Sequence, residues 1–130
     1  MPLNILKDNS PVRPSFISTL NSVIQQVEYQ CFTDLRTGYI DPLYKELCLI
    51  IAEVFVSNSE AVVKINGSVT STKLVQEVYE QIRNNHVKLV FANFKDVSCQ
   101  VYNKKAYLRT ALYNAVFELE SHFVNAECCL

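Results

Sequence analysis

The chain has 130 residues, of which 49% are hydrophobic and 19% are charged, with a formal net charge of −1. This length fits one domain with its own hydrophobic core, and this composition excludes an intrinsically disordered chain. The low net charge argues against nucleic-acid binding over the whole surface, and the two glycines argue against a many-turned all-β fold or a glycine-rich phosphate loop.

The first half of the chain predicts a leader and two helices. Residues 1–14 are rich in proline and show no hydrophobic period, which is typical of a flexible leader. A first helix is expected to open at Pro14 or Ser15, and Gly38 is placed to supply a left-handed cap behind it. Asp41 followed by proline signals the start of a second helix. This helix is the most apolar of the set, so we place it at the centre of the core.

The middle of the chain predicts a hairpin and two more helices. The Asn66–Gly67 dipeptide lies between two β-branched runs and favours a type I′ hairpin over about residues 62–70. Because two short strands are marginal alone, this hairpin must lean on a helix. A third helix follows and is interrupted at Asn84 and Asn85, where a short fourth helix begins. The residues that we expect on the inner face of the third helix are Leu74, Val75, Val78, Tyr79 and Ile82.

The last helix carries the most informative stretch of the sequence. Asn103 is a good N-cap for it, and Lys104, Lys105 and Arg109 lie near its start, off the apolar stripe. Cations at a helix start oppose the macrodipole, so they hint at a negatively charged partner, although surface charges that serve solubility are the plainer alternative. The candidate contacts for nucleic acid or another partner are Lys104, Lys105, Arg109, Lys73 and Arg83.

These elements together predict a mostly α fold, a compact bundle of about five helices with one short β-hairpin. The single helical domain is expected over residues 15–123, between the leader (1–14) and a tail (124–130). The N-terminus lacks an apolar signal core and no run approaches membrane-spanning length, so we expect no membrane association.

The cysteines and histidines give no catalytic or metal-binding pattern. No Cys-x-x-Cys pair occurs, and only His86 and His122 could join the five cysteines in a metal site. Cys48 falls on or beside an apolar helix stripe, and His86 sits at a helix start, where capping or packing is the simpler interpretation. We therefore expect reduced thiols in a cytoplasmic protein, no metal, no cofactor and no enzyme activity. The adjacent Cys128 and Cys129 suggest no particular role.

Exposed aromatic side chains are the other candidate contacts. Aromatic residues dominate the energy of protein interfaces. Phe32, Tyr39 and Phe117 are therefore predicted as a protein interface.

Five motifs in consistent order give the chain a family resemblance. They are Val27-Glu28-Tyr29, residues 47–57, Val63-Lys64-Ile65-Asn66-Gly67, His86-Val87-Lys88-Leu89-Val90, and residues 103–115. Together they resemble the C-terminal domain of RepA_N-type replication initiator A proteins of plasmids and transposons, which looks like the DnaD-type helical domain. Lys64 and Lys88 depart from the family pattern, and the N-terminal winged-helix domain of those initiators has no counterpart in this sequence.

The resemblance implies a replication-associated module of a mobile element that is not catalytic. Such a module would bind a host protein of the primase or helicase type, DNA, or both. The alternatives left open are a free-standing mobile-element inhibitor that binds a host defence protein, in the manner of an anti-CRISPR protein, and a homodimeric interaction domain. Whether DNA is touched is left open by the sequence.

Overall fold

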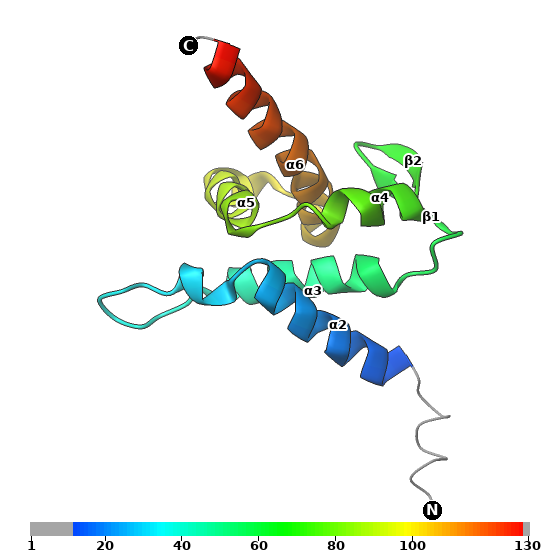
Figure 1. The fold of residues 1–130 in the computed structure, drawn as a ribbon, viewed down its shortest axis with the longest axis horizontal. Coiled ribbons are helices and arrows are strands. Elements are labelled where there is room, and N and C mark those ends of the chain that lie inside the picture. Colours follow the sequence, from blue (N-terminus) through cyan, green and yellow to red (C-terminus); the bar gives the residue numbers. More distant parts are fainter. Residues whose placement is uncertain (1–11, 129–130) are drawn as a thin grey trace, which may run out of the picture.

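The computed structural model describes residues 12–128, and the side chains of residues 16–97 and 99–120 (Figure 1). The elements in chain order are α2 (Val12–Gln26), the 3-10 helix η1 (Tyr29–Phe32), α3 (Pro42–Val56), β1 (Val62–Ile65), β2 (Ser68–Ser71), α4 (Thr72–Tyr79), α5 (Asn84–Val97), the 3-10 helix η2 (Ser98–Gln100) and α6 (Lys104–Cys128). The predicted mostly α fold with a hairpin near residues 62–70 is confirmed for the described part of the chain.

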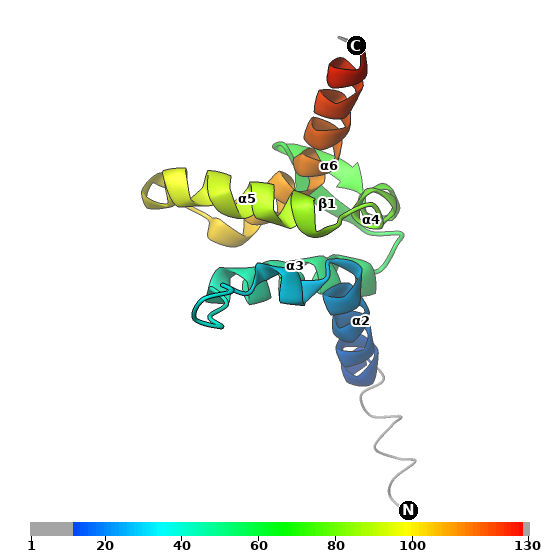
Figure 2. The same cartoon turned by 60° about the vertical axis from the view of Figure 1, so that its left-hand side comes forward.

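The helices form two layers that enclose the core. Helices α2 and α3 make one layer, and α4, α5 and α6 make the other, with the hairpin beside α4 (Figures 1 and 2). Helix α3 contacts each of the other α-helices, and its Leu47 and Ile51 are fully buried. The prediction that the most apolar helix occupies the centre is therefore confirmed, because only a helix surrounded by others can bury apolar residues on most of its faces.

Local chemistry fixes where α3 and the hairpin form. The Asp41 carboxylate accepts the backbone N–H of Leu43 at 2.9 Å, and a proline follows at the first helical position. Asn66 and Gly67 both have positive φ, 56° and 77°, as a type I′ turn requires. The side-chain amides of Asn66 and Asn114 exchange two hydrogen bonds of 3.1 and 3.0 Å, so the hairpin leans on α6 as expected.

Helix α6 begins where the sequence predicts and runs further. The Asn103 side chain accepts the N–H of Ala106 at 3.1 Å, which confirms the N-cap. The helix continues past Phe123 to Cys128, within the stretch expected as a tail. Helix α2 begins at Val12, two residues before the predicted start at Pro14 or Ser15. Its first turn tolerates Pro14, because the N–H that proline lacks would have no partner inside the helix there. Most of the predicted leader, residues 1–11, lies outside the described residues.

Two glutamine side chains join the layers by capping helix ends. Gln76 of α4 donates its amide to three carbonyls at the end of α3, at 2.9 to 3.3 Å. Gln26 of α2 donates to the carbonyls of Tyr79 and Ile82 at the end of α4, at 3.0 and 2.9 Å. Carbonyls at a helix C-terminus lack intrahelical partners, so these bonds satisfy groups that the layered packing removes from water.

None of the described helices combines the length with the apolar composition that crossing a bilayer requires.

Candidate binding groove

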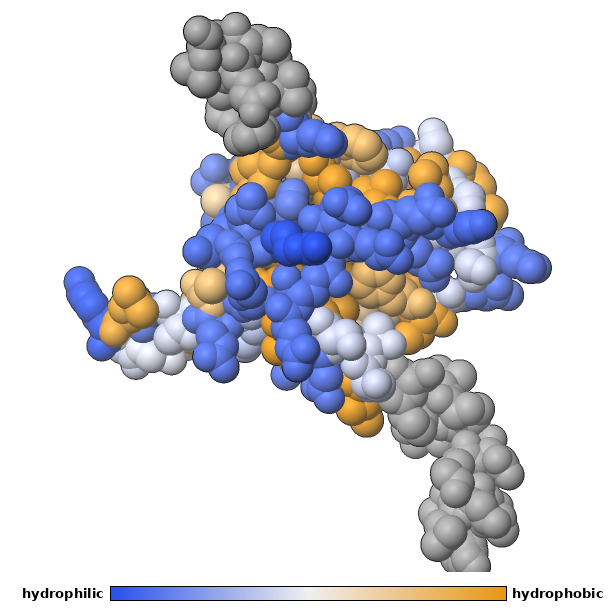
Figure 3. All heavy atoms as spheres, in the orientation of Figure 1, coloured by the Kyte–Doolittle hydropathy of each residue, from blue (hydrophilic) through white to orange (hydrophobic). Residues whose placement is uncertain are grey.

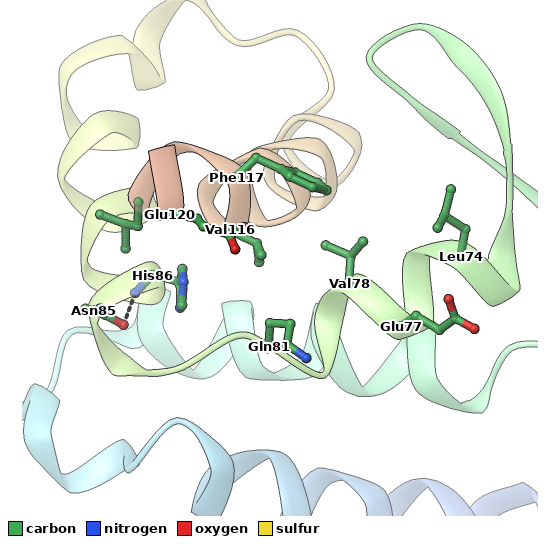
Figure 4. Close-up of a pocket in the computed structure, with 10 residues that line it drawn as sticks. Leu74, Glu77, Val78, Gln81, Asn85, His86, Val116, Phe117 and Glu120 are labelled. Carbon is green, nitrogen blue, oxygen red and sulfur yellow. Dashed lines mark hydrogen bonds between the residues drawn. The ribbon is translucent and has the colours of Figure 1, made fainter. Parts of the chain in front are cut away.

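A groove of about 600 Å³ lies between α4, the start of α5 and α6 (Figure 4). Its lining residues are Leu74, Glu77, Val78, Gln81, Asn85, His86, Val116, Phe117, Leu119 and Glu120. We call this surface the α4–α6 groove. Figure 3 shows hydrophobic side chains gathered beside the base of the outer part of α6 and toward the hairpin.

The groove exists because α4 carries apolar residues on two sides. Val75 and Tyr79 face the core and are fully buried. Leu74 and Val78 are displaced by about one residue from that inner row and face the groove instead. The prediction that Leu74 lies inside is wrong, because its side chain is 44% exposed. From α6, Phe117 adds an aromatic ring that is 48% exposed.

One hydrogen bond joins α4 to α6 about two helical turns before the part of α6 that lines the groove. The Tyr79 hydroxyl donates to the backbone carbonyl of Arg109 at 2.6 Å. Burial raises the pKa of Tyr79, so the hydroxyl stays protonated and remains a donor at any physiological pH. The spacing between the two helices that form the groove is therefore fixed by a bond between them as well as by packing.

His86 lines the groove at the start of α5, and its ring is anchored by the backbone. Its Nδ1 atom accepts the N–H of Arg83 at 2.8 Å, so the neutral ring carries its proton on Nε2. Burial, and then the positive charge of Arg83, lower the pKa of His86 below its usual 6.5. The interpretation of His86 as a residue that caps or packs at a helix start agrees with this geometry.

The charged members of the groove are acidic. Glu77 comes from α4 and Glu120 from α6, and the ten lining residues include no lysine and no arginine. Sequence reasoning missed both glutamates, and it missed the groove itself. The available signal was the second apolar row of α4, Leu74 and Val78, which gives this helix more apolar positions than one core-facing row needs.

The basic residues singled out at the start of α6 lie elsewhere, against α3. Three ion pairs join the layers there, and we call them the α3 seam. They are Lys104 Nζ with Glu46 at 2.9 Å, Lys105 Nζ with Glu53 at 2.8 Å, and Lys95 Nζ with Asp41 at 3.3 Å. The negative partners of Lys104 and Lys105 are thus carboxylates of this chain, which explains cations at a helix start without an external ligand.

Of the other predicted basic contacts, Arg109 follows Lys105 on the same side of α6, whereas Lys73 and Arg83 come from other parts of the fold. Arg109 is half-buried one turn further along α6, and Lys73 is exposed in the first turn of α4. Arg83 follows the end of α4, where its guanidinium donates to the carbonyls of Glu80 and Ile82 at 2.9 Å each.

The predicted aromatic interface is divided by the fold. Phe32 is only 7% exposed and stacks on Tyr44, with ring centroids 4.2 Å apart, so its prediction as an exposed contact is wrong. Tyr44 stacks in turn on Phe91 at 4.3 Å, which makes Phe32 the end of a three-ring stack between η1, α3 and α5. Tyr39 is 59% exposed in the loop before α3, and only Phe117 belongs to the groove.

Of the described cysteines, Cys31 and Cys99 are exposed and Cys48 is buried. Cys48 is fully buried, as its position on the apolar stripe predicts, and burial raises its pKa to about 11. A thiol in that state is neither a nucleophile nor a metal ligand at neutral pH. Across the described residues, no three His, Cys, Asp or Glu side chains cluster so as to hold a metal ion.

Comparison with known proteins identifies the family. The chain belongs to DUF6017, a family of unknown function, whose profile matches residues 9–127. Neither a curated protein nor a solved structure matches the chain.

Proposed function

We propose that this member of the DUF6017 family is a non-catalytic docking module that binds another protein through the α4–α6 groove. The groove carries the proposal, because half-exposed apolar side chains that line a concave surface mark binding sites. The five motifs that resemble the C-terminal domain of RepA_N-type initiators favour a partner of the primase or helicase type, in the replication machinery of a mobile element.

The α3 seam favours a protein partner over DNA. Lys104 and Lys105 each pair with a carboxylate, and a DNA phosphate would have to displace that carboxylate before it gained the charge. Among the remaining predicted cations, Arg109 is half-buried, and Lys73 and Arg83 lie outside α6. A protein partner that docks through apolar contacts does not have to displace a carboxylate from a lysine. We therefore rank a protein partner before DNA.

The test compares two charged substitutions at exposed apolar positions. Phe117→Asp places a carboxylate in the groove, whereas Leu35→Asp places one on the loop before α3, where Leu35 is 97% exposed. Each full-length variant would be used to capture proteins from a bacterial cell lysate, with mass spectrometry as readout. We expect a primase or helicase to bind the unchanged chain and the Leu35 variant but not the Phe117 variant.

Other results would reject parts of the proposal. If only the Leu35 variant loses the partner, the binding surface is the loop before α3, which also carries Tyr39, and not the groove. Capture of a host nuclease would replace the replication role with that of a defence inhibitor. Circular dichroism must show equal helix content in both variants, and we expect this because both side chains lie at exposed positions.

A further inference from the structure

We infer that the occupant of the α4–α6 groove is an amphipathic helix of the partner protein that carries basic residues beside its apolar row. This inference rests on the proposed docking function and adds the chemistry of the partner. It follows from two properties of the groove, the nature of its walls and the sign of its charge.

The walls favour a helix over an extended peptide. Both long walls of the groove are helices, α4 and α6, whose backbone N–H and C=O groups are bonded within each helix. The groove therefore offers side-chain contacts and no free sheet edge to pair with. An occupant must satisfy its own backbone, which a helix does, while its apolar side chains contact Leu74, Val78 and Phe117.

The charge of the groove favours a basic helix. Glu77 on the α4 wall and Glu120 on the α6 wall are both exposed, and neither forms an ion pair with any side chain that the structure describes. On the α3 seam, by contrast, Asp41, Glu46 and Glu53 each have a lysine. Lys or Arg residues that flank an apolar helix row would complement the two glutamates across the groove.

The first measurement uses two designed peptides of about 16 residues with one shared apolar Leu/Ala row at helical spacing. One peptide carries lysines beside that row and the other carries glutamates. Binding of each to the full chain would be followed by fluorescence anisotropy at low and high salt. We expect the lysine peptide to bind about tenfold more tightly at low salt, with a smaller difference at high salt.

A matched pair of double variants then assigns the preference to the groove. Glu77→Lys with Glu120→Lys reverses the groove charge, and we expect it to reverse the peptide preference. Glu60→Lys with Glu118→Lys changes the net charge of the chain equally, but these glutamates do not line the groove. We expect this control to keep the preference for the lysine peptide, because screening weakens charges away from the contact.

Three results would overturn the inference, and they are separable from failure of the docking function. Equal binding of both peptides, abolished by Phe117→Asp, would leave docking intact and remove the basic helix. Binding of neither peptide would reject the helix as occupant. A dimer in sedimentation experiments that Phe117→Asp dissociates would assign the groove to a second copy of this chain.

Discussion

The α3 seam and the α4–α6 groove use charged and apolar side chains in opposite ways. On the seam, Lys104 and Lys105 meet the carboxylates of Glu46 and Glu53, and Lys95 lies over the Phe91 ring. In the groove, Phe117 is half-exposed and the glutamates make no ion pair with a described side chain. The seam is complete within one chain, whereas the groove is not. The charges most visible in the sequence are therefore the ones least available to a partner.

Aromatic packing against α3 contributes more to stability than the ion pairs of the α3 seam do. Lys104 and Lys105 are about half exposed, and ion pairs in that setting contribute only about 0 to 1 kcal/mol each. The Phe32–Tyr44–Phe91 stack is better shielded, and Lys95 lies over its last ring at 5.1 Å from the centroid. Stacked rings contribute both their buried area and a geometric preference. The ion pairs then orient α6 on α3, while the stack holds η1 and α5 to the same helix.

The largest expected difference comes from truncating one phenylalanine that packs against α3 and one that lines the groove. Phe32→Ala should lower the free energy of unfolding by about 3 kcal/mol, because it removes a buried ring and leaves a cavity beside Tyr44. Phe117→Ala should lower it by about 1 kcal/mol or less, because its ring is half in water. Urea denaturation followed by circular dichroism measures both. Similar losses for the two variants would mean that the groove is packed within this chain.

A second measurement breaks the seam by charge and then restores it. Lys104→Glu with Lys105→Glu should lower the free energy of unfolding by about 1 kcal/mol, because attraction across the layers becomes repulsion. Adding Glu46→Lys and Glu53→Lys reinstates opposite charges and should recover most of the loss. The double variant should keep the partner and the peptide affinity of the groove. A large loss of DNA binding in the double variant would show instead that these lysines meet phosphates.

Features set by neighbouring residues were predictable from the sequence. Asp41 and Asn103 mark helix starts because an N-cap needs only a short acceptor side chain and the next few amides. Asn66–Gly67 fixes a hairpin because its turn needs two residues that tolerate positive φ. The period of α3 identified the central helix, since burial on several faces requires apolar residues on all of them.

Features set by distant residues were not predictable in the same way. Nothing near Lys104 in the chain indicates Glu46, because their pairing depends on how α6 crosses α3. Phe32 follows the end of α2, and its burial depends on Tyr44 arriving opposite it. Leu74 has the spacing of a core residue and is exposed only because nothing described from α6 covers it. The candidate site therefore emerges from packing, whereas the elements that build it emerge from local patterns.

The smallest expected effect uses acid to weaken one region and spare the other. The folded-state pKa of His86 is lowered, so as the pH falls through 6.5 the unfolded chain takes up its proton before the folded chain does. The contribution of the neutral His86 ring to the free energy of unfolding is fully present above pH 6.5. It is lost as the pH falls toward the folded-state pKa. On the seam, a backbone hydrogen bond and Lys95 lower the pKa of Asp41, so its contribution persists until the pH falls below 3.8.

Mild acid should therefore loosen the groove end of α5 while the seam holds. Comparing the unfolding free energy of the unchanged chain with that of His86→Gln between pH 7.5 and 5 isolates the effect, because the two proteins share every other titratable group. The unchanged chain should lose more stability on acidification than the variant. Parallel pH profiles would show that the ring accepts a proton as easily when folded as when unfolded. The Nδ1 bond to the Arg83 amide would then give the neutral ring no advantage over the protonated ring in the folded chain.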